Sequence, residues 1–275
     1  NLIKQNITIS ISGLNSSKPF SSLASDELSS FDLLEKTQCI PLYRYDKSGN
    51  RIDNITYWGF QQFKEHYTKG MRASNCYTEE QLNTMSDDEL MDVGLDEGEF
   101  YLTKEKIFHY VYAVLHNPAY RKKYELNLKR EFPRIPFYDD FHQWAAWGEC
   151  LMYLHINYET VEPYPLQLVC SSAINGASPI AKLKADKEAG IIVLDNLTEL
   201  TGIPAEAWNY KFGNRSALEW ILDQYKESKP KDLTIASTFN TYRFADYKEQ
   251  VLDLLKRVCT VSVETMKIVD EMEKG

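Results

Sequence analysis

Hydrophobic and polar residues alternate in the first third of the chain, which is the spacing of β-strands. Isoleucine stands at four of the five odd-numbered positions in residues 3–11, and residues 39–45 and 51–55 predict further strands. Lysine, serine, glycine and asparagine at residues 47–50 favour a turn between the last two strands. We therefore expect a strand-rich part over residues 1–100.

The middle of the chain changes to apolar residues at three- and four-residue intervals, which predicts amphipathic helices. We expect helices over residues 104–116 and 118–132, and a third from residue 139 or 140 to residue 156. Asn117 is expected to be the N-cap of the second helix, because Pro118 suits the first helical position. Residues 101–160 therefore predict a helical part.

The last part, residues 161–275, predicts a small sheet followed by helices. Short apolar runs at residues 181–185 and 191–194 favour a hairpin. A helix is expected to follow an N-cap at Asn214 or Ser216, with Glu219 closing a capping box. One long helix or two consecutive helices should follow residue 246. The predicted fold class is α+β, with these three parts either separate or joined in one compact domain.

Charge is distributed unevenly along the chain, and this changes the meaning of the net charge of −9. Residues 79–99 contain nine acidic residues and no Lys or Arg, which predicts a boundary or a surface insertion. Residues 104–134 contain eight Lys or Arg and three Glu. A phosphate-facing surface is therefore compatible with the acidic total, although solvated faces are the alternative interpretation of both runs.

Several classes of protein are not favoured by the sequence. The five cysteines are scattered without a Cys-x-x-Cys pair, so we expect buried free thiols rather than disulfides or zinc ligands. No apolar run approaches the length of a membrane-spanning helix, and a cytoplasmic protein is expected. The chain begins with Asn in what reads as a strand, which favours a piece of a longer protein.

Motifs for catalysis are also weak. The nearest match to an amino-methyltransferase loop, residues 117–120, lacks its second proline, and no phosphate-binding loop occurs. Residues 227–229 match a nuclease Glu-x-Lys pattern by chance in a polar segment. The five histidines lack metal-ligand spacing and are expected to be packed or surface residues.

The amino-acid sequence of residues 210–225 and 242–251 is the most specific feature of the chain. These segments resemble the C-terminal region of Type ISP restriction-modification enzymes, single polypeptides with nuclease, helicase, adenine methyltransferase and target-recognition parts. The resemblance extends over nearly the whole chain and implies a target-recognition domain without catalytic activity of its own. It implies that the domain binds double-stranded DNA and presents one adenine to the methyltransferase in a bacterial defence enzyme.

The resemblance also implies which ligands and partners belong elsewhere. S-adenosylmethionine, ATP and Mg²⁺ are expected only in other domains of the parent polypeptide, and those domains are expected partners.

Candidate DNA-binding residues follow from side-chain chemistry, because Arg, Lys, Asn and Ser reach base edges and phosphates. Two polar loops are candidates. In residues 13–19, a glycine and small hydroxyl residues allow close backbone approach, and the resemblance supports this loop. In residues 170–176, Asn175 could pair with an adenine edge. For both loops, the alternative is an ordinary polar connection without a role in binding. For Arg215, the alternative to DNA binding is an ion pair with Glu219 or Asp223. The candidates are Asn15, Ser16, Ser17, Lys18, Arg44, Arg51, Arg121, Lys122, Asn175, Lys211, Asn214, Arg215 and Arg243.

A second function from another class remains open at this stage. The chain would then be a protein–protein docking module of the parent enzyme that reads no bases. Its docking face would be the apolar stripe of the C-terminal helix, formed by Val251, Leu254, Leu255, Val258 and Val261.

Overall fold

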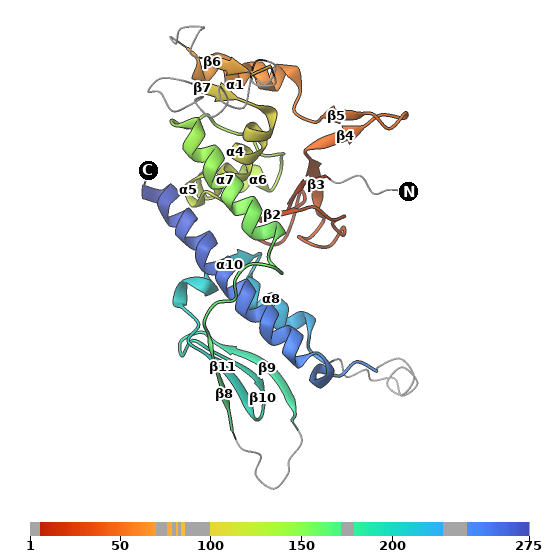
Figure 1. The fold of residues 1–275 in the computed structure, drawn as a ribbon, viewed down its shortest axis with the longest axis vertical. Helices are drawn as coiled ribbons and strands as arrows, with labels where there is room; N and C mark the ends of the chain where they lie inside the picture. Colours follow the sequence, from red (N-terminus) through yellow and green to blue (C-terminus); the bar gives the residue numbers. More distant parts are fainter. Residues whose placement is uncertain are drawn as a thin grey trace. The chain divides into compact units, whose positions relative to one another are not determined.

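A computed structural model of the chain describes residues 6–69, 76–78, 81, 84–85, 100–171, 179–227 and 241–274. The chain divides into two compact units, residues 1–156 and 157–275 (Figure 1). Each unit combines helices with small sheets, so the predicted α+β class is confirmed.

A three-stranded antiparallel sheet opens unit 1, in the order β2-β1-β3. Its strands are β1 (Thr8–Ile11), β2 (Ser22–Ser25) and β3 (Gln38–Pro41). The alternation predicted for β1 places Ile9 and Ile11 in the core, at 0% and 1% exposure. Ile11 lies opposite Ser22 on one side and Gln38 on the other. The β1–β2 connection and the segment before β3 therefore meet at one end of the sheet.

The β4–β5 hairpin follows, formed by β4 (Tyr43–Tyr45) and β5 (Arg51–Asp53). Asn50 donates from its backbone N–H and its side chain to the Asp46 carboxylate, both at 2.8 Å, and Gly49 adopts a φ of 84°. These contacts confirm the predicted turn. The predicted strand over residues 39–45 is divided, because Leu42 is buried between β3 and β4, which belong to different sheets.

Two helices of unit 1 form its core. Residues of α4 (Lys104–His116) and α7 (Phe141–Ile156) confirm the first and third predicted helices of the central part. They approach closely at Gly148, where an added Cβ would lie 1.8 Å from the His109 carbonyl oxygen.

The predicted helix over residues 118–132 is wrong in its length. It divides at Tyr124 into α5 (Pro118–Lys123) and α6 (Glu125–Leu128). Its start is correct, since the Asn117 side chain accepts the Tyr120 N–H at 2.9 Å.

The remaining elements of unit 1 were not predicted. They are α1 (Tyr57–Tyr67) and a parallel pair, β6 (Cys76–Thr78) with β7 (Phe100–Leu102). Helix α1 begins at Thr56, whose side chain accepts the Gly59 N–H at 3.1 Å, and it buries Phe60 and Phe63. The acidic segment at residues 79–99 lies outside the described residues, apart from residues 81, 84 and 85.

Unit 2 contains a four-stranded antiparallel sheet in the order β8-β11-β10-β9. The strands are β8 (Gln167–Cys170), β9 (Ala181–Asp186), β10 (Ile191–Asp195) and β11 (Thr198–Thr201), which confirms the predicted β9–β10 hairpin. A further antiparallel pair is formed by β12 (Lys211–Phe212) and β13 (Arg215–Ser216), which a turn connects. The predicted helix follows as α8 (Ala217–Gln224), with Ser216 as its N-cap.

Helices complete unit 2. Two short 3₁₀ turns, η3 (Ala205–Trp208) and η4 (Phe244–Asp246), accompany one long helix, α10 (Lys248–Lys274). Trp208 and Phe244 are buried at 4% and 2% exposure, as expected for core aromatics. Helix α10 packs against η3 and α8 within this unit.

Cysteine burial differs from the prediction. Cys259 is a buried free thiol. Cys39, Cys150 and Cys170 are free thiols that are exposed to solvent. Among the described residues, no helix has the length and hydrophobicity that a membrane crossing needs.

Candidate nucleic-acid interface

The β1–β2 loop, defined here as residues 13–18, lies against the basic run of the sequence. The Asn15 N–H donates to the Lys129 carbonyl oxygen at 2.8 Å, at the end of α6. The Lys36 ammonium donates to the Asn15 carbonyl oxygen at 3.1 Å. The fold therefore brings the Lys36 ammonium and the Lys129 carbonyl to a loop that sequence reasoning selected from its own residues only, while the Lys129 ammonium pairs with Glu125 at 2.9 Å.

A carboxylate holds the inner side of this loop. Glu35 Oε2 accepts the Ser16 hydroxyl at 2.7 Å and the Ser17 N–H at 3.1 Å, and Oε1 accepts the Ser17 hydroxyl at 3.0 Å. The Lys18 N–H also donates to Oε2, at 3.3 Å. The hydrogen bonds from Ser16 and Ser17 lower the pKa of Glu35. Four donors of the loop are thus satisfied by one residue that sequence reasoning missed.

Arg121 fastens the start of β2, which follows the loop, to the helices. Its Nε donates to the Leu115 carbonyl oxygen at 2.6 Å and its Nη2 to the Ser22 hydroxyl at 3.1 Å. Its guanidinium also lies 5.8 Å from the centre of the Phe20 ring. Arg121 is therefore used for structure here, whereas its neighbour Lys122 is exposed on α5.

Behind β2 lies a buried polar cluster. Tyr112 Oη accepts the Ala24 N–H at 2.7 Å and contacts His155 Nδ1 at 2.5 Å, while His116 Nδ1 lies 2.8 Å from the Tyr112 carbonyl oxygen. Burial lowers the pKa of His155 to about 3, and burial together with Arg121 lowers the pKa of His116 well below its ordinary value. These two histidines are packed, as expected, and fix the sheet to α4 and α7.

The β4–β5 hairpin carries two further candidates on opposite faces. Arg44 lies across from the exposed Ile52, whereas Arg51 lies across from Tyr45 and places its guanidinium 4.3 Å from the Tyr43 ring centre. Both arginines are exposed.

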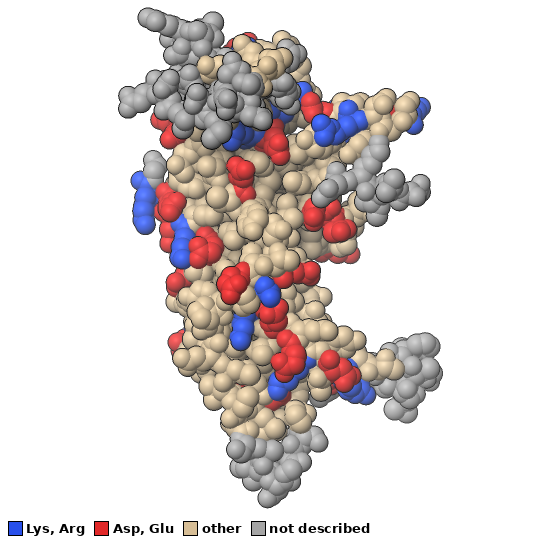
Figure 2. Space-filling view, viewed as in Figure 1, with Lys and Arg blue, Asp and Glu red and all other residues tan. Residues whose placement is uncertain are grey.

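The acidic residues of this hairpin are occupied within the chain. Asp46 accepts from Asn50, and Asp53 forms an ion pair with Lys104 at 2.5 Å. Arg44, Arg51 and the exposed Lys47 are therefore the cations that this hairpin offers to a ligand. Figure 2 shows Lys and Arg side chains along the hairpin, and acidic side chains scattered among basic ones elsewhere on this face.

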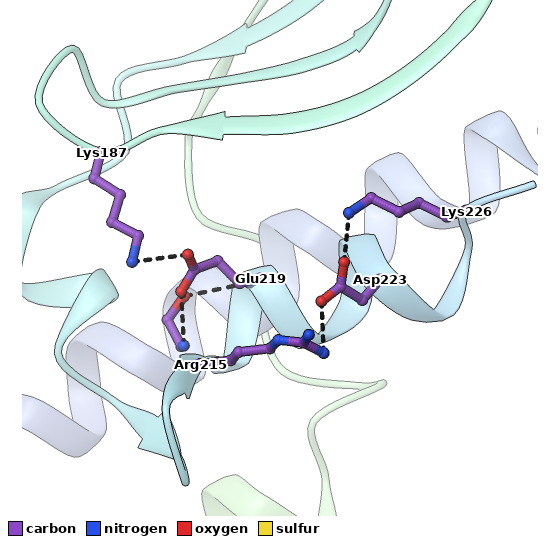
Figure 3. Close-up of polar contacts among 6 residues, drawn as sticks. Lys187, Arg215, Glu219, Asp223 and Lys226 are labelled. Atoms are coloured by element: carbon purple, nitrogen blue, oxygen red, sulfur yellow. Dashed lines mark hydrogen bonds and ion pairs between the residues drawn. The ribbon is translucent and has the colours of Figure 1, made fainter.

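In unit 2, three candidates lie at the β12–β13 turn. Lys211 and Asn214 are exposed, and Gly213 between them has a φ of 60°. Arg215 Nη1 forms an ion pair with Asp223 at 2.7 Å, as one sequence interpretation proposed (Figure 3).

Two carboxylates of α8 neutralise the cations around this turn. Figure 3 shows that Lys226 shares Asp223 with Arg215, and that Lys187 of the β9–β10 turn reaches Glu219 at 2.7 Å. Burial raises the pKa of Glu219, but hydrogen bonds from Lys187 and Ser216 outweigh it and lower the pKa overall. Three cations of unit 2 near this turn are thus paired with carboxylates of α8, namely Lys187, Arg215 and Lys226.

The last candidates do not join these groups. Arg243 is exposed, and its Nη1 donates to the Tyr242 carbonyl oxygen at 2.7 Å. Asn175, with most of the second predicted loop, lies outside the described residues. The apolar stripe suggested for docking is buried in this chain, with Val251 and Leu255 at 0% exposure and Val258 at 5%.

The model of the Type ISP C-terminal specificity domain matches residues 1–254. The chain belongs to this family. The resemblance stated from the sequence is therefore confirmed. No curated protein matches this Type ISP specificity domain.

Solved structures resemble this Type ISP specificity domain along nearly its whole length. A cryo-EM structure of a DrdV–DNA complex is 49% identical, with a TM-score of 0.82 over 98% of this chain and 25% of the other. A nuclease-deletion mutant of the Type ISP restriction-modification enzyme LlaGI, in complex with a DNA substrate mimic, is 27% identical, with a TM-score of 0.68 over 98% of this chain and 21% of the other.

The ATP-dependent Type ISP restriction-modification enzyme LlaBIII, bound to DNA, is 24% identical with a TM-score of 0.65 over 98% of this chain and 16% of its own, which shows a likeness of fold alone. This specificity domain therefore spans a quarter or less of each of the three chains.

Proposed function

We propose that this chain recognises a specific double-stranded DNA sequence as the specificity domain of a longer Type ISP enzyme. The observation that carries the proposal is its 49% identity, over 98% of its length, to a chain solved in a DrdV–DNA complex. Recognition by a separate domain needs exposed groups that reach bases and phosphates. Asn15, Lys18, Arg44 and Arg51 are exposed on unit 1 and supply such groups.

We further propose that recognition here positions a target adenine for a methyltransferase domain elsewhere in the parent polypeptide. The chain itself would perform no chemistry, and S-adenosylmethionine, ATP and Mg²⁺ would bind to those other domains. Double-stranded DNA and the neighbouring domains would be its partners, in the bacterial cytoplasm. The net charge of −9 makes local charge the deciding quantity, because phosphate contacts depend on where cations lie.

The first test is selection of duplex DNA from a randomised pool by this chain at low salt, followed by sequencing. Enrichment of one short asymmetric site is expected, and an Asn15→Ala, Lys18→Ala variant should lose it. Affinity should also fall steeply with salt, because Lys and Arg contacts to phosphate release counterions. A matched control is Lys267→Ala, in α10 of unit 2, which removes one exposed cation remote in sequence from the loop.

Failure to retain DNA at low salt would contradict the proposal and favour the docking function. The adenine-positioning step has its own test in the parent enzyme. Methylation of one adenine in the selected site is expected, and the same double variant should reduce it. Methylation that ignores the selected site would contradict this step alone.

A further inference from the structure

The segment before β3 is in direct backbone contact with the β1–β2 loop. The Gly13 N–H donates to the Glu35 carbonyl oxygen at 3.1 Å, two residues beyond the last pair of β1 with β3. A Cβ added to Gly13 would lie 2.0 Å from the Lys36 carbonyl oxygen. Gly13 is therefore required by this close approach, which brings residues 35 and 36 under the loop.

The Glu35 carboxylate then accepts hydrogen bonds from four donors of the loop. Its shortest bond, 2.7 Å, comes from the hydroxyl of Ser16, which is only 8% exposed. The Ser17 hydroxyl and the N–H groups of Ser17 and Lys18 complete the set. Because hydrogen bonds to a carboxylate are stronger than those between neutral groups, this set fixes the loop more firmly than a polar turn would alone.

The backbone on both sides of the contact is held in an unfavourable conformation. Glu35 and Lys36 have φ values of 62° and 55°, in the left-handed region that most residues with a Cβ rarely adopt, and Asn15 has a φ of 56°, which asparagine adopts more readily. Such conformations persist when surrounding contacts determine them, and they are common at binding sites. Here the surrounding contacts are the carboxylate bonds and the Lys36–Asn15 hydrogen bond.

The arrangement separates holding residues from reading residues. Ser16 and Ser17, both predicted to bind DNA, direct their hydroxyls to Glu35. Asn15 and Lys18 are exposed, and within the described part of the chain their side chains form no hydrogen bond or ion pair. They are the two members of the loop whose polar side chains remain available to a ligand.

We infer that Glu35 is the positioning residue of the β1–β2 loop, holding residues 16–18 so that Asn15 and Lys18 meet DNA in a fixed geometry. The inference rests on the proposed function. Preorganisation of a loop improves affinity and discrimination, because less conformational freedom is lost on binding. Glu35 would contact no base or phosphate itself, and its effect would pass through the loop.

A different role for the same donors would be to bind a DNA phosphate after Glu35 leaves. Two N–H groups and two hydroxyls around one point can form an anion site. The burial of Ser16 argues against this role, since the hydroxyl that makes the shortest bond is scarcely accessible. The two roles also predict opposite effects of removing the carboxylate, so one experiment separates them.

The first measurement needs no DNA. Hydrogen exchange of a peptide covering residues 16–18 is compared among the wild type, Glu35→Gln and Glu35→Gly. Glycine suits the positive φ of residue 35, so Glu35→Gly removes the carboxylate without adding backbone strain. Glu27→Gln is the matched control, because it removes the same charge from an exposed glutamate of unit 1.

Exchange at residues 16–18 should be at least about tenfold faster in Glu35→Gly, and faster to a smaller degree in Glu35→Gln, whose amide oxygen still accepts part of the set, while the control stays at the wild-type rate. Unchanged exchange in both variants would overturn the positioning role, whatever the chain does with DNA. A thermal unfolding midpoint close to the wild-type value would show that the loop, and not the whole unit, has loosened.

The second measurement compares affinities for the selected DNA site and for single-base changes of it. The ratio between them should fall about tenfold in both Glu35 variants with an unchanged salt dependence, because base discrimination is lost and phosphate contacts are kept. Tighter binding to every sequence would indicate a phosphate in the vacated site and would overturn the inference. A wild-type chain that selects no site would overturn the proposed function, and the reading role with it, even if exchange shows that Glu35 holds the loop.

Discussion

A serine hydroxyl and a glutamate carboxylate stabilise a turn in each unit, but at very different separations along the chain. In unit 2, Ser216 and Glu219 are three residues apart and form the capping box of α8. In unit 1, Ser16 and Glu35 are separated by 19 residues and meet only because β1 pairs with β3. The first contact is local and forms with its own helix. The second depends on the tertiary fold, and on everything that holds the sheet in place.

The largest expected difference between the units is their response to acid. His116 and His155 are buried in unit 1 with lowered pKa values, and all five histidines of the chain lie in that unit. Below pH 6.5 the unfolded chain binds protons that the folded chain does not. The free energy of unfolding therefore decreases as the pH is lowered. At pH 5 protonation linkage at His155 should lower the free energy of unfolding by about 2 kcal/mol, and His116 adds a loss of the same sign.

This acid effect can be measured for each unit separately. The chain is equilibrated in urea at pH 7 or pH 5 and then pulse-labelled with deuterium at one fixed pH, so that peptide masses report local unfolding. Unit 1 should unfold at clearly lower urea at pH 5, with unit 2 less affected. His155→Gln should weaken the dependence, whereas His66→Gln, at an exposed position, should keep it. An equal loss of stability in both units at pH 5 would contradict the expectation.

A smaller difference in stability is expected between the alanine variants of two turn glycines, Gly13 in unit 1 and Gly213 in unit 2. Gly13→Ala would force a Cβ against the Lys36 carbonyl and should cost about 1–3 kcal/mol through overpacking. Gly213→Ala is strained by its own φ of 60° and should cost about 1 kcal/mol. Urea unfolding with regional exchange checks both. A Gly13→Ala variant no less stable than Gly213→Ala would show that residues 35 and 36 move aside easily.

Removal of the N-cap of α8 should lower the free energy of unfolding by about 1 kcal/mol. Ser216→Ala deletes the acceptor of the Glu219 N–H, which lies at 3.2 Å. Faster exchange should be confined to α8, and residues 13–18 should be unchanged. Glu219→Gln is the comparison, because glutamine can still close the box while the Lys187 ion pair is lost. A greater loss of protection in Glu219→Gln than in Ser216→Ala would assign the stability to the ion pair.

The smallest expected effect is at Arg215. Its side chain is 61% exposed, so the ion pair with Asp223 is screened by solvent. Arg215→Gln should therefore change the free energy of unfolding by at most about 0.5 kcal/mol in urea titrations. If Arg215 exchanges Asp223 for a phosphate, the slope of log affinity against log salt should fall by about 1. An unchanged slope would leave Arg215 with its role in the turn alone.

The same contrast between local and distant contacts separates what the sequence could predict from what it could not. Helix α4, the β9–β10 hairpin and the capping box follow from spacings of a few residues, and each was predicted. Helix α1 was missed because Gly59 and its aromatic residues have modest helix propensity; a cap at Thr56 and the burial of Phe60 and Phe63 stabilise it.

Contacts across long separations left no pattern to detect. Glu35 was missed as a site residue because its partners lie 17 to 19 residues earlier, and its left-handed backbone favours glycine or asparagine over glutamate. Arg121 was predicted from its charge, but its partners at Leu115 and Ser22 depend on the packing of α5 against β2. Residue chemistry thus found the loop, and only the fold distinguished its holding groups from its available ones.

The Gly13–Lys36 approach also sets a rule for altering this domain by exchange of segments. A new loop at residues 13–18 would arrive without the backbone and carboxylate against which it is shaped, because those belong to residues 35 and 36. The two segments form one transplantable module, even though β2 lies between them in the chain. Chimeras that carry both segments from one donor should keep a defined loop, whereas chimeras that carry one should not.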